Sequence, residues 1–334
     1  MKSRVGATIV LLGVGLAIAG MTGWGALVLF YLAPGTAEAR TAVAWSFAAL
    51  GLAALVGLAV RRARSPAILG FAVVFAMVLL VWTRARPSND RDWQPEVAVL
   101  PYATIDGEYV TVHNIRNFDY RTETDFTPAY YDRKFDLRRL DRVDLVAVYW
   151  MGPAIAHLFV TFGFGDEHLA ISIEARKDRT KPYATVPGFF RQYELVYVVA
   201  DERDVIRLRT NYRKSPPEEV YLFRVNRPIE YGRRIFLDYM RDINELREHP
   251  RFYNTLTTNC TTVILGHASV NPEPIPYSWK VLVSGYAPEY MYDRGRLDRS
   301  MPFAELMQRG HINAAAQAAD QASDFSRRIR ANVP

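Results

Sequence analysis

The 334-residue sequence contains one cysteine, Cys260, so no intramolecular disulfide can form and a disulfide-stapled scaffold is excluded. A disordered chain is excluded as well, because half of the residues are hydrophobic. The sequence has no Gly-rich phosphate-binding loop, no G-x-S-x-G nucleophile elbow and no H-E-x-x-H zinc motif. The usual sequence signals of nucleotide-binding, serine hydrolase and zinc protease sites are therefore absent.

Acidic residues are scarce in the first 83 residues, which contain Glu38 as their one acid against six basic residues. The chain carries a formal charge of +6, of which +5 lies in this part, and the remaining 251 residues are close to neutral. A basic chain suggests a nucleic-acid partner. Here the excess charge belongs to the most apolar part of the chain, so we predict no nucleic-acid partner.

Three apolar runs without acidic or basic residues occupy residues 5–32, 41–60 and 67–82. The first exceeds the roughly 20 residues that cross a bilayer, and the third is short, but flanking arginines can snorkel. We predict a membrane anchor of three transmembrane helices over residues 1–86. The alternative is a signal peptide, with a cleavage site at Ala37-Glu38-Ala39, followed by a soluble helical hairpin. The first run is too long for the apolar region of a signal peptide, about 7–15 residues, and two more runs follow.

Basic residues predict the orientation of these spans. Lys2 and Arg4 precede the first span, and Arg61, Arg62 and Arg64 fill the loop between the second and third. By the positive-inside rule the N-terminus is cytoplasmic, and three spans place the rest of the chain outside. We therefore predict a bacterial inner-membrane protein with a periplasmic C-terminal domain.

The remaining sequence mixes strand and helix patterns. Strand patterns cover residues 109–112, 144–150, 157–164, 168–173, 194–199, 205–209 and 220–225. A turn at residues 163–166 predicts a hairpin over 157–173, and helices are predicted over 228–248 and 259–267. The predicted class is α+β behind the membrane anchor. We divide the rest of the chain into a connector (87–108), an extracytoplasmic domain (109–310) and a C-terminal tail (311–334).

The sharpest local motif surrounds Cys260. Thr257, Thr258 and Asn259 are capping residues placed directly before the apolar run 263–266, so Cys260 should lie in the first turn of a helix. Free backbone N–H groups and the positive end of the helix dipole favour a thiolate there and can hold an oxyanion. A small buried core residue is the alternative, since most free cysteines are of that kind.

A thiolate nucleophile needs a base, usually histidine. His157 begins a predicted strand, and His168 begins the next strand across the turn. His267 lies two helical turns from Cys260, about 10 Å along the axis and too far for proton transfer. A spacing of 11 between His157 and His168 matches no zinc motif, so we predict neither a metal nor a cofactor.

From about Tyr109 to Gly310 the sequence resembles the bacterial domain that forms the N-terminal periplasmic domain of Lnb-type lipoprotein N-acyltransferases. The resemblance rests on RFYNTLTTNCTT around Cys260, AHLFVTFGF from Ala156, FFRQYELVYVVADERDVIRLRTNY from Phe189, and VSGY at 283–286. More distantly, a histidine strand followed by an Asn-Cys helix resembles permuted papain-like folds. The resemblance implies a papain-like (permuted) antiparallel sheet plus helices.

The resemblance also implies thiol acyl transfer. His157 would deprotonate Cys260, which would attack a phospholipid ester and form an acyl-thioester. An amine such as a lipoprotein N-terminus would then accept the acyl chain. The Cys260 amide and Asn259 would stabilise the oxyanion, while His168 would orient His157 or polarise the carbonyl. Ala156 stands before His157 where Lnb-type proteins tend to have glycine, and their membrane segments are arranged differently, so the reaction class transfers better than the acceptor.

Three other functions remain open on the sequence. A peptidoglycan or peptide amide hydrolase would use the same fold and the same cysteine. A non-catalytic envelope module would bind lipid or lipoprotein and keep Cys260 buried and unreactive. A transport component is disfavoured, because the three apolar runs contain no charge that could mark a pathway.

Overall fold

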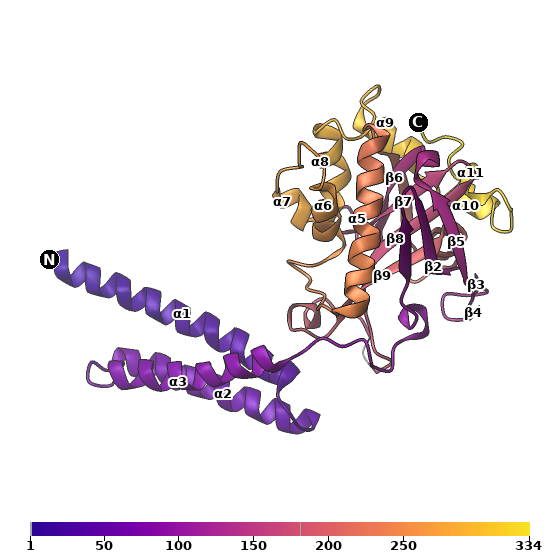
Figure 1. The fold of residues 1–334 in the computed structure, drawn as a ribbon. Coiled ribbons are helices and arrows are strands. Elements are labelled where there is room, and N and C mark those ends of the chain that lie inside the picture. The colour runs from indigo at the N-terminus through magenta and orange to yellow at the C-terminus, as the bar shows by residue number, and fades with distance from the viewer. Residues whose placement is uncertain (1, 181) are drawn as a thin grey trace. The chain divides into compact units, whose positions relative to one another are not determined.

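The computed structural model describes residues 2–180 and 182–334, without the side chains of residues 2–4. The orientation prediction that used Lys2 and Arg4 therefore rests on side chains outside the described part. The chain divides into two compact units: residues 1–87 with 184–192, and residues 88–183 with 193–334 (Figure 1). The second unit thus includes the connector and the tail that the sequence set apart from the extracytoplasmic domain.

The first unit consists of three long helices and one short segment. The helices are α1 (Lys2–Leu32), α2 (Ala37–Ala59) and α3 (Arg64–Arg84). All three are long and apolar enough to cross a membrane, as the sequence predicts. Thr36 caps α2, and Thr22 of α1 packs so closely on Gly51 of α2 that a Cβ there would lie 2.1 Å from the Thr22 hydroxyl oxygen. Small residues at such crossings let membrane helices approach each other.

The short segment of the first unit is residues 184–192, which contain the 3-10 turn η3 (Pro187–Phe189). Phe190 stacks on Tyr31 near the end of α1, with ring centroids 5.4 Å apart. Arg191 donates to the carbonyl of Trp82 at 2.7 Å and lies 4.1 Å over its ring. Aromatic and arginine side chains thus meet at the C-terminal ends of α1 and α3, as is typical of membrane–water interfaces.

The second unit is built on an eight-stranded sheet, ordered β1-β2-β9-β8-β7-β6-β10, with β5 paired to β2. Neighbours pair antiparallel, apart from a parallel contact between β2 and β9. The strands are β1 (Tyr102–Asp106), β2 (Tyr109–Arg116), β5 (Tyr130–Asp136), β6 (Arg142–Tyr149), β7 (Ala156–Phe164), β8 (Glu167–Arg176), β9 (Glu194–Asp201) and β10 (Glu219–Arg224). A separate ladder joins β3 (Asp119–Tyr120) and β4 (Phe126–Thr127). The α+β class and the hairpin of β7 and β8 are confirmed.

Helices cover both faces of the sheet (Figure 1). On one face lie α5 (Ile229–Glu248), α6 (Cys260–Ala268), α7 (Trp279–Leu282), α8 (Ala287–Asp293) and α9 (Phe303–Gly310). Phe236 and Tyr239 of α5 pack there against Phe162 of β7. The other face is covered by α4 (Glu202–Arg207), α10 (Asn313–Ala318) and α11 (Phe325–Arg328). Alternate strand residues point to opposite faces, so the apolar strands β6 to β9 are buried on both.

The strand predicted over residues 205–209 is wrong. The chain there forms α4 and a π-helical turn at Leu208–Tyr212. Asp201 ends β9 and caps α4 by accepting from the Arg203 amide at 2.9 Å. Val205 and Ile206 then reach the core from a helix, which a short apolar pattern does not distinguish from a strand.

Candidate active site

Cys260 is the first residue of α6, as the capping pattern predicts. The Asn259 side chain accepts from the amides of Thr261 and Thr262, both at 3.0 Å, and Thr262 accepts from the Asn259 amide at 2.9 Å. This reciprocal capping box begins the helix immediately before the cysteine. The thiol therefore lies at the positive end of the helix dipole, which favours its anionic form.

His157 lies near the start of β7, where β7 and β8 separate. Their ladder begins with Phe159 opposite Ser172, although β8 continues to Arg176 along β9. The His157 side chain and the Leu158 amide both lie close enough to the Cys260 sulfur to lower the pKa of the thiol. The end of the ladder thus leaves space in which a strand amide and an imidazole contact the thiol together.

Two residues of β8 hold the other side of the imidazole. His157 Nε2 lies 2.7 Å from Ser172 Oγ and 3.1 Å from Glu174 Oε1. Ser172 Oγ donates to the same carboxylate oxygen at 2.8 Å, so it accepts from Nε2–H. Since Nε2 is engaged there, Nδ1 is the ring nitrogen that remains for Cys260. The order of contacts is Cys260, His157, Glu174.

Charges at the site favour a thiolate–imidazolium pair. Burial disfavours the imidazolium, but Glu174 and Cys260 outweigh it and raise the pKa of His157 to about 9. Burial also opposes the Cys260 thiolate, and the charge and hydrogen bond of His157 overcome this and lower the pKa of the thiol. The same imidazolium holds the pKa of Glu174 well below its usual range against the cost of burial. Cysteine nucleophiles are activated in this way.

An arginine cluster supports Glu174 on the sheet face that α4, α10 and α11 cover. Arg209, in the π-helical turn, donates to Glu174 at 2.9 Å and lies 3.4 Å from Glu218. Glu218 also pairs with Arg213 at 2.7 Å. The Arg209 side chain is 6% exposed, so its charge acts at low dielectric and keeps Glu174 ionised. Its charge also opposes protonation of His157, but less strongly than the Glu174 carboxylate favours it.

The structure does not bring His168 together with His157 and Cys260. His168 pairs with Gly163, six residues further along β7, or about 20 Å at about 3.3 Å per residue. It lines a polar hollow with Asp201 and Arg330, and burial lowers its pKa. Its Nε2 is buried without a hydrogen-bond partner among the described residues.

Asn259 is occupied by the helix start. Its Oδ1 accepts from two amides of α6, and its Nδ2 donates to the Thr255 carbonyl at 2.7 Å. These bonds also engage the Thr261 and Thr262 amides, so the Cys260 amide is the better candidate for an oxyanion. The geometry fits Asn259 as a residue that positions Cys260.

Glu174, Ser172 and Arg209 are the site residues that the sequence reasoning missed. One signal was available for Glu174. The hairpin register Phe159–Ser172, continued by two residues, sets Glu174 opposite His157. It is also the one charged residue inside the apolar run 169–175, where an unpaired carboxylate would be costly.

His267 lies seven residues after Cys260 in the same helix, α6, and has partners of its own. It contacts Asp238 through Nδ1 and Tyr197 through Nε2, both at 2.7 Å, and stacks on Tyr239. Its ring nitrogens are thus engaged between α5 and β9. Within residues 2–180 and 182–334, no group of three or more His, Cys, Asp or Glu side chains is arranged to hold a metal ion.

Residues 126–285 match the family model of the Lnb N-terminal periplasmic domain. The match contains Cys260, His157, Ser172, Glu174 and Arg209, and it confirms the resemblance over these residues, slightly less than half of the chain. No curated protein and no solved structure matches the chain. Three candidate membrane spans followed by a periplasmic-type domain identify a membrane protein.

Proposed function

We propose that the protein is a cysteine-dependent acyltransferase of the bacterial inner membrane, with its N-terminus in the cytoplasm and its active site in the periplasm. The observation that carries the proposal is the contact chain Cys260–His157–Glu174, with the thiol on a helix N-terminus. The arrangement of a cysteine helix against a histidine strand supports a permuted papain-like fold for residues 109–310.

The first half-reaction forms a thioester. The Cys260 thiolate attacks the ester carbonyl of a phospholipid, and the negative charge moves to the carbonyl oxygen. The Cys260 amide at the start of α6 is aimed to stabilise this oxyanion. His157 Nδ1 gives its proton to the departing alkoxide, so a lysophospholipid leaves and the acyl chain stays on sulfur.

The second half-reaction forms an amide. His157, now neutral, takes a proton from an incoming amine, such as a lipoprotein N-terminus. The amine nitrogen bonds to the acyl carbon, and the carbon–sulfur bond breaks. Thiolate and imidazolium are restored, so no net proton is consumed at the dyad. Glu174 holds the imidazole orientation through both steps, in the role that the resemblance assigned to His168.

Exposed apolar side chains on the segments that lead into β7 and α6 or adjoin α6, here called the rim, support a lipid substrate. The rim consists of Met151 and Ile155 before β7, Leu256 before α6, and Tyr277 and Trp279 at α7. Met151 is 69% exposed and Trp279 is 59% exposed, so both present apolar surface to the surroundings. In a chain that three spans hold at a bilayer, such a rim suits contact with lipid.

The backbone around the rim is held in place. Gly285 donates to the Ala154 carbonyl at 3.0 Å, and the Ala156 amide donates to Ser284 Oγ at 3.0 Å. A Cβ at Gly285 would lie 2.1 Å from the Pro153 carbonyl oxygen, so only glycine fits this contact. Segment 283–286 therefore fixes the loop from which the His157 strand starts.

The test is capture of the acyl-enzyme. The full-length protein in nanodiscs is incubated with phospholipid and, separately, with muropeptides, and the Cys260 peptide is examined by mass spectrometry. We expect an acyl mass that hydroxylamine removes, formed from phospholipid and lost in His157→Ala. Cys260→Ser is the matched control, which retains the site's shape with a poorer nucleophile. Acylation that persists in His157→Ala would overturn the mechanism, and reaction with muropeptides alone would favour an amide hydrolase.

A further inference from the structure

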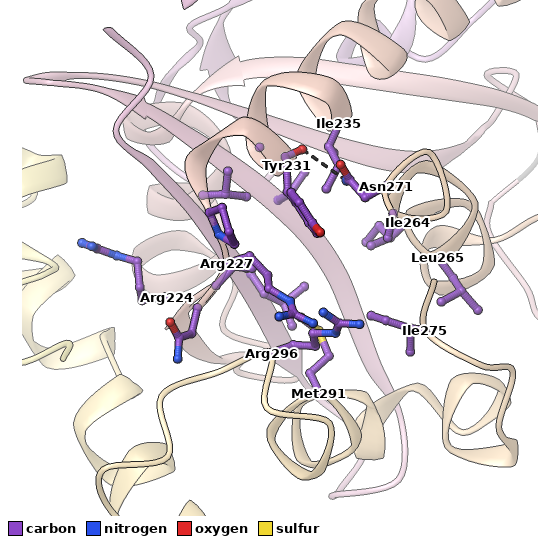
Figure 2. Close-up of a pocket in the computed structure, with 18 of the residues that line it drawn as sticks. Arg224, Arg227, Tyr231, Ile235, Ile264, Leu265, Asn271, Ile275, Met291 and Arg296 are labelled. Atoms are coloured by element: carbon purple, nitrogen blue, oxygen red, sulfur yellow. Dashed lines mark hydrogen bonds between the residues drawn. The ribbon is translucent and has the colours of Figure 1, made fainter. Parts of the chain in front are cut away.

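A cavity of about 440 Å³ lies between α5, α6 and α8, a volume typical of small-molecule sites. Its walls are mainly apolar and include Ile235 of α5, Ile264 of α6 and Met291 of α8 (Figure 2). Leu158 and Thr261 also line it. Because the Leu158 amide lies close to the Cys260 sulfur and Thr261 follows Cys260, the cavity extends to the immediate neighbours of the thiol.

Arginines form another part of the wall. Figure 2 shows Arg227 and Arg296 reaching toward each other, with Ile264 and Ile275 across the cavity. Both arginines contact one carboxylate: Arg227 Nη2 is 2.9 Å and Arg296 Nη1 is 3.6 Å from Glu273 Oε2. Two guanidinium groups therefore share one carboxylate, which leaves this part of the wall with one positive charge in excess. Elsewhere in the lining Asp141 and Asp298 stand against Arg142 and Arg224.

Two guanidinium donors at the cavity have no acceptor. The Nε atoms of Arg227 and Arg296 are buried without a hydrogen-bond partner in the described part of the chain. A buried donor that lacks an acceptor destabilises the protein, and a charged donor does so more strongly. The Arg296 side chain is 11% exposed, so water reaches it poorly. An anionic ligand group would supply both the acceptors and the missing charge.

We propose that this cavity binds one acyl chain of an anionic lipid, with the headgroup phosphate against Arg227 and Arg296. A free phosphate would leave the apolar walls uncovered, and a neutral chain would leave the arginine donors unpaired. The three spans hold the chain at a bilayer, where such lipids are abundant. Only the identification of this lipid as the acyl donor rests on the proposed function, because binding requires no reactive Cys260.

Photolabelling of the full-length Cys260→Ala protein in phosphatidylcholine nanodiscs tests the site. The probe is a long-chain alkyl phosphate with a diazirine in its chain, compared with an alkyl trimethylammonium probe of the same chain. We expect labelling of the α6 and α8 peptides that contain Ile264 and Met291. The phosphate probe should label about tenfold more strongly, the ratio that one charge-assisted contact of about 1.4 kcal/mol gives.

Variants of the cavity distinguish the effect of the arginine charges on labelling from the effect of the cavity's shape. Replacing both arginines, Arg227→Met with Arg296→Met, should reduce phosphate labelling to the level of the ammonium probe. Ile264→Trp should fill the cavity and remove labelling by both. The control is Arg309→Met, which removes an exposed arginine paired with Glu305 on α9. The comparison of the two probes uses the Cys260→Ala protein with both arginines and Ile264 in place. It therefore remains valid even if one of these variants does not fold.

Equal labelling by the two probes, labelling outside these peptides, or insensitivity to the arginine changes would overturn the proposal. Full competition by inorganic phosphate alone would also overturn it, in favour of a free-anion site. If the wild-type protein forms its thioester while the cavity stays unlabelled, the lipid site fails and the acyltransferase proposal stands. If the cavity is labelled and the wild-type protein forms no thioester, the lipid site stands and the acyltransferase proposal fails.

Discussion

At the scale of single residues, the reactivity of Cys260 depends on groups from three separate parts of the chain. A helix N-terminus supplies its dipole, a strand start supplies His157 and the Leu158 amide, and the next strand supplies Glu174. Together they outweigh the cost of burying the charge and lower the pKa of the Cys260 thiol.

Glu174→Gln tests whether Glu174 acts on His157 through its negative charge or only through its shape. The change keeps the side chain's size but removes the charge that most raises the pKa of His157. We expect thioester formation to slow by about 10- to 100-fold. We also expect the alkaline limb of the rate–pH profile to move to lower pH, because the imidazolium loses its stabiliser.

His168→Ala is the control for this prediction. It should leave both the rate and the pH profile close to wild type, since His168 lies far along β7 from the dyad. A large loss in His168→Ala with little effect in Glu174→Gln would return the orienting role to His168.

Asn259→Ala tests the cap. Two α6 amides lose their acceptor, so we expect the free energy of unfolding to fall by about 1 kcal/mol, seen as a lower apparent melting temperature. Asn259→Ser should recover most of the loss, because serine is an equally good cap. Full thioester formation in the serine variant would support a positioning role, whereas a strong loss there would indicate that the amide itself contacts the oxyanion.

The residues found from sequence are those with local signals. Cys260 follows a run of capping residues, and His157 begins an apolar strand, so both could be predicted one at a time. Glu174 gains its role only through pairing between two strands, and Arg209 only through a π-helical turn on the sheet face that α4, α10 and α11 cover. Such contacts depend on tertiary register, which a single sequence does not specify.

At the scale of elements, the C-terminal segment is part of the folded core, although its composition gives no sign of this. Residues 311–334 are rich in alanine and glutamine and carry little pattern. In the structure Ile312, Phe325 and Ile329 are buried against the sheet as part of its second core. Apolar residues spread over short helices give no sustained period, and their burial becomes visible only when the sheet is present.

A buried ion cluster fixes this segment. Arg330 donates to Glu202 at 2.6 and 2.7 Å and to Asp144 at 2.9 Å, and all three side chains are 6% exposed or less. Arg330→Met should destabilise the protein by about 3–5 kcal/mol, because two carboxylates lose the buried cation that neutralises them.

A thermal-shift series checks this value. The matched control is Arg309→Met, which breaks an exposed pair with Glu305 on α9 and should cost less than about 1 kcal/mol. Similar shifts for the two variants would mean that Arg330 is not a structural centre of the fold.

At the scale of the whole molecule, the charge excess of the chain is explained by its membrane part. Five of the six net charges lie in the first 83 residues, and Arg61 and Arg62 are in the loop between α2 and α3. The rest of the chain, which includes the match to a periplasmic domain, is close to neutral. This distribution agrees with the positive-inside rule, by which the basic residues beside the spans stay in the cytoplasm.

Thiol labelling of spheroplasts before and after lysis tests this topology. As the sole cysteine, Cys260 should react with a membrane-impermeant maleimide in spheroplasts before lysis. A cysteine placed in the α2–α3 loop, Ala63→Cys in a Cys260→Ala background, should react only after lysis. The opposite pattern would place the active site in the cytoplasm.

The most direct test of the central claim is the rate of Cys260 alkylation against pH in the full-length protein. An isolated thiol reacts along a curve with its midpoint near about 8.5. We predict that the midpoint for wild-type Cys260 lies below that of an isolated thiol, because the His157 imidazolium, whose pKa is raised to about 9, stabilises the thiolate. In His157→Asn the midpoint should return toward that of a free thiol. An identical profile in the wild type and in His157→Asn, with its midpoint near that of a free thiol, would contradict the thiolate–imidazolium pair.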